Sequence, residues 1–257
     1  MLYFPRISHR CLPNICPGDS YNMMRRGEYM NYGNSTYNDY YKNMIYSQMN
    51  RCFCNKSFFK LLNTYTDCPV DVHINEIVMG ENIKTGCFTR YAQFNPGTYR
   101  IKIYKTNEPK KLIFESDINI EKNLAYTGVI TADDNDRTDI NLLVIPEAKD
   151  NYIKGDVSSV KLANLLVDAL PSELVASDGA VWFSGINYGD VSNNVVVPSG
   201  KYNLELRDKK SKKSVASIRN FSPTAKMHYT IYLVGNAEKP DIKIIVPEDG
   251  VNYLELC

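Results

Sequence analysis

The second half of this 257-residue chain repeats the landmarks of the first half in the same order. Gly97 and Tyr99 recur as Gly200 and Tyr202, each 103 residues later. Other matches share nearly the same offset: Tyr126-Thr127 with Tyr229-Thr230 at 103, and Lys60-Leu61-Leu62-Asn63 with Lys161-Leu162-Ala163-Asn164 and Ile145-Pro146 with Val246-Pro247 at 101. Several anchors in one order, within two residues of a single offset, indicate a duplicated domain.

Short runs of alternating apolar and polar residues fill both repeats. Residues 99–104 read YRIKIY and residues 202–207 read YNLELR, and a glycine-containing turn precedes each run. A period of two, interrupted by turn residues about every ten residues, is typical of antiparallel strands. We therefore expect an all-β protein with two tandem immunoglobulin-like antiparallel β-sandwiches, at residues 57–149 and 157–250.

Six repeated residues are expected to have structural roles at turns and corners. Gly97 and Gly200 stand where a tight turn needs a positive φ before a strand. Tyr99 and Tyr202 open the strands that follow. Early in a later strand of each repeat, Tyr126 and Tyr229 are expected to bury their rings while their hydroxyls bond a neighbouring turn, as in a tyrosine corner.

Residues 1–56 differ in composition from the repeats and are expected to be largely irregular. Residues 1–50 hold eight of the 19 tyrosines and six of the eight methionines. This segment also contains four of the seven cysteines: Cys11, Cys16, Cys52 and Cys54. Because seven cysteines cannot all pair within one chain, we expect these four to form cross-links between chains. Free thiols and a zinc site remain open alternatives.

The second repeat resembles the DUF4397 family, whose members are bacterial β-sandwich domains often found in tandem in surface proteins. The resemblance rests on Tyr188-Gly189-Asp190-Val191-Ser192, Val197-Pro198-Ser199-Gly200-Lys201-Tyr202 and His228-Tyr229-Thr230. The first repeat keeps Pro96-Gly97-Thr98-Tyr99 and Ala125-Tyr126-Thr127. In place of the YGDVS segment it has Gly86-Cys87-Phe88-Thr89-Arg90-Tyr91. The resemblance implies a fold and no reaction. Separately, the N-terminal segment is similar in composition to bacterial spore coat and exosporium proteins.

Signals of catalysis are absent from the sequence. It contains none of the GxSxG, HExxH, GxGxxG or GxxxxGK[ST] motifs. The acidic run Asp133–Asp139 is interpreted as a solvated hairpin tip, with a cation cage as an open alternative. We therefore expect no catalytic residue, cofactor or metal. A net charge of +1 gives no reason to expect a nucleic-acid partner, and no run of about 18 apolar residues predicts a transmembrane segment.

These patterns favour a non-enzymatic structural or assembly protein, of the bacterial spore coat or exosporium, that is cross-linked through its N-terminal segment. The alternative is a binding module that recognises a glycan or a protein at the cell envelope through its loops. The first residues lack the features of a secretory signal, so we expect synthesis in the cytoplasm. Self-association or contact with other structural proteins would then place the chain in spore surface layers; the cytoplasm or the cell envelope are alternative locations.

Overall fold

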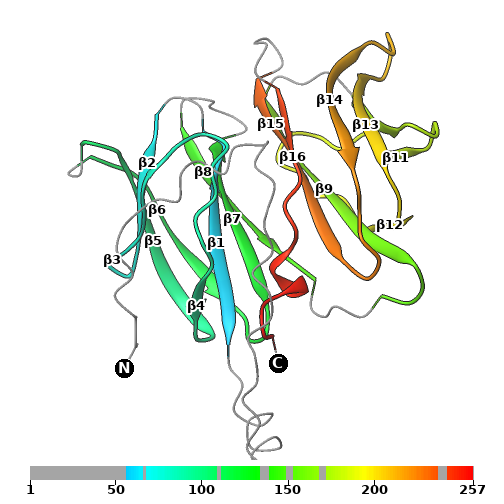
Figure 1. The fold of residues 1–257 in the computed structure, drawn as a ribbon. Helices are drawn as coiled ribbons and strands as arrows, with labels where there is room; N and C mark the ends of the chain where they lie inside the picture. The colour runs from blue at the N-terminus through cyan, green and yellow to red at the C-terminus, as the bar shows by residue number, and fades with distance from the viewer. Residues whose placement is uncertain are drawn as a thin grey trace, which may run out of the picture.

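The computed structural model describes residues 56–65, 68–108, 111–133, 139–148, 153–167, 172–236 and 242–256. Across these ranges the chain forms sixteen strands and one 3-10 turn, Gly250–Asn252, which confirms the expected all-β fold (Figure 1). No helix among the described residues is long and apolar enough to cross a bilayer.

The first repeat contributes eight strands in two four-stranded sheets. The sheet that faces the second repeat, called the inner sheet, has the strand order β4-β1-β7-β8. The sheet on the opposite side, called the outer sheet, has the order β3-β2-β5-β6. The strands are β1 (Ser57–Asn63), β2 (Val70–Ile74), β3 (Ile77–Ile83), β4 (Ala92–Phe94), β5 (Gly97–Lys105), β6 (Leu112–Ile120), β7 (Ala125–Ala132) and β8 (Ile140–Pro146).

The second repeat has the same plan. Its inner sheet has the order β12-β9-β15-β16, and its outer sheet has the order β11-β10-β13-β14. The strands are β9 (Val157–Val167), β10 (Ser172–Ala176), β11 (Val181–Ser184), β12 (Val195–Pro198), β13 (Tyr202–Asp208), β14 (Ser214–Phe221), β15 (His228–Asn236) and β16 (Lys243–Ile245). The repetition seen in the sequence is thus a repetition of topology.

Most strand pairs are antiparallel, as expected, but the centre of each inner sheet contains a parallel pair. β1 runs parallel to β7 and places Lys60 beside Thr127. β9 runs parallel to β15 and places Lys161 beside Thr230 in the same way. Parallel strands need a long crossover connection. Here the strands between the first strand of a repeat and its parallel partner, most of them in the outer sheet, form that connection.

The two inner sheets pack against each other, so the molecule has four layers of sheet. Every residue of β7 is buried, and so is every residue of β15 except the last. In β15, residues 231–234 form an apolar run of the kind that a sheet buried on both faces requires. In β7, AYTGVITA, small and hydroxyl residues alternate with the apolar ones. The apolar contact between the repeats consists of Leu62, Val129, Ile145, Ala163, Leu165, Tyr232 and Val234, with Phe88, Leu143 and Ile245 at its border.

Candidate functional site at the contact between the repeats

A buried lysine, threonine and acid meet at the edge of this contact in the first repeat. The Thr127 hydroxyl donates a hydrogen bond of 3.2 Å to Glu147 Oε1. Lys60 Nζ lies 3.7 Å from the same oxygen, and the Lys60 and Glu147 side chains are only 6% and 1% exposed. Buried charges need partners, and these three groups supply one another.

The second repeat carries the same triad as Lys161, Thr230 and Asp249. The Thr230 hydroxyl donates to Asp249 Oδ1 at 2.8 Å. The backbone confirms the equivalence of the acids, because Glu147 N donates to Ala125 O and Asp249 N donates to His228 O. Alignment by Ile145-Pro146 with Val246-Pro247 pairs Glu147 with Glu248 instead, and this pairing is wrong. Glu248 is exposed, and the offset in space at the end of each repeat is 102 residues.

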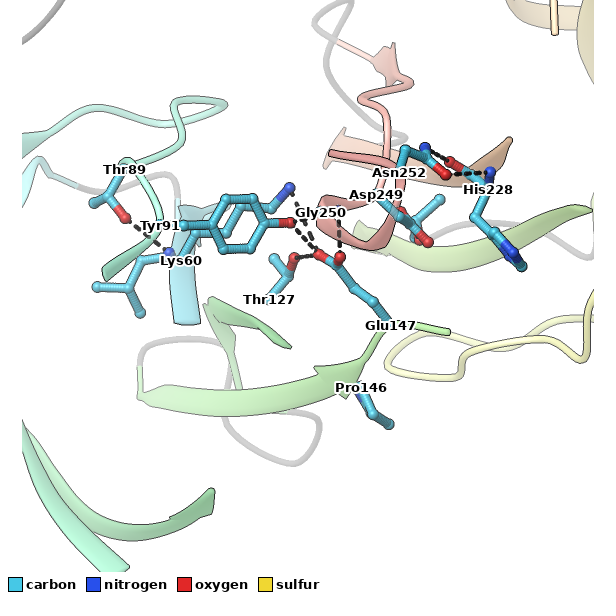
Figure 2. Close-up of polar contacts among 12 residues, drawn as sticks. Lys60, Thr89, Tyr91, Thr127, Pro146, Glu147, His228, Asp249, Gly250 and Asn252 are labelled. Atoms are coloured by element: carbon cyan, nitrogen blue, oxygen red, sulfur yellow. Dashed lines mark hydrogen bonds and ion pairs between the residues drawn. The ribbon is translucent and has the colours of Figure 1, made fainter. Parts of the chain in front are cut away.

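Hydrogen bonds beside the two triads cross from one repeat to the other, and Figure 2 shows those among Gly250, Glu147 and Tyr91. Gly250 N, in the C-terminal 3-10 turn, donates to Glu147 Oε2 and to the Tyr91 hydroxyl. The Tyr91 hydroxyl donates to Glu147 Oε1, and Lys161 Nζ donates to Pro146 O at 2.6 Å. We call this set the inter-repeat polar cluster; it consists of Lys60, Tyr91, Thr127, Glu147, Lys161, Thr230, Asp249 and Gly250.

Burial sets the ionisation of the cluster. Desolvation lowers the pKa of both Lys60 and Lys161, although the nearby carboxylates oppose this shift. Burial, followed by repulsion from Glu147, raises the pKa of Asp249 to about 6 despite its attraction to Lys161. Burial also raises the pKa of the Tyr91 phenol. The ionisable groups of the cluster therefore lie where water is largely excluded and burial opposes their charged forms, between the two repeats.

Two aromatic rings cover the ammonium group of Lys60. Lys60 Nζ lies 5.0 Å from the centroid of the Phe88 ring and 4.5 Å from that of Tyr91. Both distances fall within the range of cation–π attraction. The Phe88 ring in turn meets Tyr232 of the other repeat, with 5.7 Å between the ring centroids. The loop that carries Phe88 and Tyr91 thereby closes one side of the contact.

That loop, residues 86–91, is the counterpart of residues 189–194 in the second repeat. Gly86 N donates to Asn63 O at 2.7 Å, and Gly189 N donates to Asn164 O at 2.8 Å. Both glycines have a φ of 79°. The first repeat therefore contains the loop that the sequence comparison treated as replaced, and the 103-residue spacing of the two glycines was the available signal.

Matching side-chain bonds complete this equivalence. Thr89 Oγ1 accepts a hydrogen bond from Leu61 N, and Ser192 Oγ accepts one from Leu162 N, both at 2.9 Å. Thr89 and Ser192 thus each anchor their loop to the first strand of the repeat, which keeps the loop at the border of the contact.

A shallow groove of about 470 Å³ lies beside Lys161, between β8 and the loop 189–194. Its lining combines an apolar strip with amide, hydroxyl and carboxylate groups: Leu143, Val144, Ile145, Pro146, Lys161, Gly189, Asp190, Val191, Ser192, Asn193 and Asn194. The two repeats build this groove jointly, so sequence periodicity within one repeat could not reveal it.

The corner tyrosines Tyr126 and Tyr229 precede the cluster residues Thr127 and Thr230 in the chain, but their side chains pack in the core of their own repeat. The hydroxyls of Tyr126 and Tyr229 accept hydrogen bonds, each of 3.1 Å, from the backbone N–H groups of Glu121 and Thr224. The Tyr99 hydroxyl donates back to Asn95 O at 2.8 Å. These tyrosines connect strands to turns within one repeat.

The two turn glycines differ from each other. Gly97 has a φ of 153°, a value that favours glycine, whereas Gly200 is not among the residues with positive φ, so that expectation is wrong for Gly200. A Cβ on Gly200 would make an ordinary contact of 3.5 Å with the Tyr202 ring, whose hydroxyl donates to Pro198 O at 3.0 Å. The turn is therefore shaped by the Tyr202 ring and its hydrogen bond, with no positive φ at Gly200.

The predicted cross-linking cysteines and most of the acidic run are not among the residues that the structure describes. Cys11, Cys16, Cys52 and Cys54 lie outside the described residues, as do residues 134–138 of the acidic run. In the part of the chain that the structure describes, no group of three or more His, Cys, Asp or Glu residues could hold a metal ion.

A family model described as "Domain of unknown function (DUF4397)" matches residues 57–169 and 158–253. The chain belongs to the DUF4397 family. Its two DUF4397 repeats stand in tandem, as the sequence resemblance implied, and the loop equivalence above extends the family pattern to the first repeat.

Solved structures similar to the chain have low sequence identity to it. A candidate cell adhesion protein from Bacteroides ovatus is 10% identical, with 76% of this chain and 95% of that chain covered and a TM-score of 0.23. A candidate adhesin from the same species is 9% identical, with 75% and 94% covered and a TM-score of 0.22. For the TIE protein of Bacillus anthracis the values are 8% identity, 71% and 50% coverage and a TM-score of 0.21. These scores are too low to support an argument about function. A search of curated proteins gives no match.

Proposed function

We propose that this chain is a non-enzymatic assembly protein whose two DUF4397 repeats act as one rigid block and whose N-terminal segment links copies to each other. The observation that carries the proposal is the inter-repeat polar cluster. Its ionisable groups are buried, and Lys161 and Glu147 each bond to a backbone group of the other repeat, Pro146 O and Gly250 N. Buried polar groups that are satisfied in this way stabilise the connection between the repeats.

The apolar contact supports rigidity in the same direction. Leu62, Val129 and Ala163 are fully buried between the inner sheets. Domains joined only by a flexible linker move independently unless their interface is large and apolar. A stiff block suits a protein that builds a layer, because each copy then presents its surfaces in a fixed geometry.

The linking role is proposed for Cys11, Cys16, Cys52 and Cys54. Thiols become disulfides when their surroundings turn oxidising. Such a change accompanies the release of a spore from its mother cell, and the spore coat or exosporium is the location that we propose on the composition of residues 1–56.

The test compares three forms of the full chain on non-reducing gels after mild oxidation. We expect reducible multimers from the wild type and far fewer when these four cysteines are changed to serine. The control changes Cys68 and Cys87, two half-buried thiols of the first repeat, to serine and should multimerise like the wild type. Equal multimers from all three forms would contradict linkage through the N-terminal segment.

A second candidate function is recognition of a glycan or a protein, and the groove beside Lys161 favours it. The groove combines an apolar strip with amide and hydroxyl groups, a mixture that can both pack against a ligand and orient it. Binding of the monomeric chain to a glycan array, with loss of binding in an Asn193→Ala/Asn194→Ala variant, would support this function.

A further inference from the structure

The contact between the repeats has an approximate twofold relation. On one side, the loop 86–91 of the first repeat faces β16 of the second, as shown by the 3.8 Å between a Cβ built on Gly86 and Ile245 Cδ1. On the other side, the loop 189–194 of the second repeat faces β8 of the first across the groove. β8 and β16 are equivalent strands, and so are the two loops.

The two sides differ in what fills them. Phe88 and Val191 are equivalent, because each makes the isolated bridge to the first strand of its repeat, Phe88 to Leu62 and Val191 to Ala163. By the same 103-residue offset, Tyr91 corresponds to Asn194. The first side therefore carries two rings over Lys60, whereas the second carries a valine and an amide.

The second repeat therefore has the lysine of this aromatic site, Lys161, with a valine and an amide where the first repeat has two rings. Lys161 occupies the place of Lys60, in the same register beside the threonine of its triad. Val191 is 37% exposed in the groove, and Asn194 is also exposed. The molecule thus displays, in its own first repeat, the chemistry that fits this place: an aromatic ring against a partly desolvated ammonium group.

We propose that the groove between β8 and the loop 189–194 binds a tyrosine side chain from residues 1–50 of a second copy of this chain. This inference rests on the proposed assembly function and names the contact that brings copies together before they are linked. It is non-covalent and needs no oxidant.

Two observations favour this occupant. Tyr91 shows that a phenol fits the equivalent site, with its ring over a lysine and its hydroxyl bonded to a carboxylate and to a backbone N–H group. Residues 1–50 carry eight tyrosines, which precede the folded repeats. An aromatic side chain over a cation gains both apolar burial and electrostatic attraction.

The experiment uses the full chain under reducing conditions, so that disulfides play no part. N-acetyltyrosinamide is titrated while the backbone amide resonances of residues 189–194 are followed by NMR, and self-association is measured by sedimentation velocity. The test variant, Val191→Phe/Asn194→Tyr, copies the first repeat and should fill the groove. The control, Val215→Phe/Ser217→Tyr, adds the same side chains to exposed positions of β14.

In the wild type and the control, we expect N-acetyltyrosinamide to shift the resonances of residues 189–194 and to reduce self-association. In the test variant, its affinity should fall by about tenfold or more, the loss expected when a ring is excluded from a partly desolvated cation, and the chain should sediment as a monomer.

Three results would overturn the inference. In the first, N-acetylleucinamide binds as well as the tyrosine derivative. In the second, a sugar binds where the tyrosine derivative does not. In the third, the amide resonances of residues 189–194 in the wild type without added ligand stay the same at every protein concentration, which would mean that no tyrosine of a second copy enters the groove. Disulfide multimers without tyrosinamide binding would refute this inference alone. Tyrosinamide binding without disulfide multimers would refute only the cross-linking role.

Discussion

At the residue scale, the two turn glycines provide a matched pair for separating backbone strain from packing. We expect Gly97→Ala to lower the free energy of unfolding by about 1 kcal/mol or more, because a φ of 153° strains any residue with a Cβ. Gly200→Ala should change it by less than about 0.5 kcal/mol, since the new Cβ meets the Tyr202 ring at ordinary distance. Urea denaturation of both variants measures the difference, and equal losses would contradict the assignment.

The corner tyrosines allow a second test at this scale. Tyr126→Phe and Tyr229→Phe each remove the acceptor of a backbone N–H group while leaving the ring in place. We expect a cost of about 1 kcal/mol in each case, because the donor is left without its partner. Similar losses of unfolding free energy for the two variants, measured by thermal unfolding, would show that the tyrosine corner stabilises both repeats equally. A variant as stable as the wild type would mean that water replaces the hydroxyl.

At the scale of elements, the C-terminal 3-10 turn connects the second repeat to the first. The side-chain amide of Asn252 donates to His228 O and accepts from His228 N, which fixes the turn against β15 (Figure 2). Gly250 then approaches so closely that an added Cβ would lie 2.5 Å from Leu254 Cδ1, a flexible side chain of the same segment, and 2.8 Å from Tyr91 Cζ, in a ring of the other repeat. The turn works as a connection because glycine lets the backbone N–H group reach Glu147.

We therefore expect Gly250→Ala to weaken the contact between the repeats by about 1–3 kcal/mol, the usual cost of overpacking a buried site. Hydrogen exchange should become faster at Tyr91 and along the loop 86–91, while exchange in the outer sheets stays unchanged. Gly200→Ala serves as the control. Unchanged exchange at Tyr91 would show that the turn does not hold the repeats together.

At the scale of the whole molecule, the apolar contact predicts cooperative unfolding. We expect the wild type to unfold in one transition and residues 57–250 to survive limited proteolysis together, because the inner sheets are buried against each other. Val129→Asp places a charge in this contact, where the side chain is fully buried, and should split unfolding into two transitions. Val196→Asp, at a position 62% exposed, is the matched control. Cleavage of the wild type near 150–156 into two stable fragments would refute a single block.

The same contact should respond to pH through Asp249, which faces Glu147, Lys161, Lys60 and Thr230. Its pKa rises from 3.8 to about 6 on folding, so the folded state binds a proton more tightly than the unfolded state. This contribution to stability is fully present below pH 3.8 and is lost as the pH rises through about 6.

Between pH 5 and 7.5, wild type should lose about 1 kcal/mol relative to Asp249→Asn, which keeps an acceptor for Thr230 and cannot ionise. Thermal unfolding of both proteins across this range gives the comparison, in which other titrating groups cancel. Parallel pH profiles would show that Asp249 does not titrate in this range.

The sequence alone determined the duplication, the all-β class and the presence of two sandwich domains, because these follow from local alternation and from turn residues at a fixed offset; the parallel pair in each inner sheet was seen only in the structure. The same offset could have identified the loop 86–91, since Gly86 and Gly189 are spaced like the other anchors. The offset could not identify Asp249 as the equivalent of Glu147, because the offset at the end of each repeat is 102 residues and not 101 or 103. Only the equivalent hydrogen bonds, from Glu147 N to Ala125 O and from Asp249 N to His228 O, reveal the match.

Only the tertiary structure decided that the two inner sheets bury each other. Alternation in one strand tells which residues face its own core, but a strand such as β7 is buried on both faces by residues distant in the chain. The sequence gives no sign that Lys60 and Lys161 are buried; they are structural because Glu147, just after β8, and Asp249, just before the 3-10 turn, lie near them in space. The groove beside Lys161 depends on both repeats at once. Pairing of this kind is set by packing between surfaces, which no local pattern encodes.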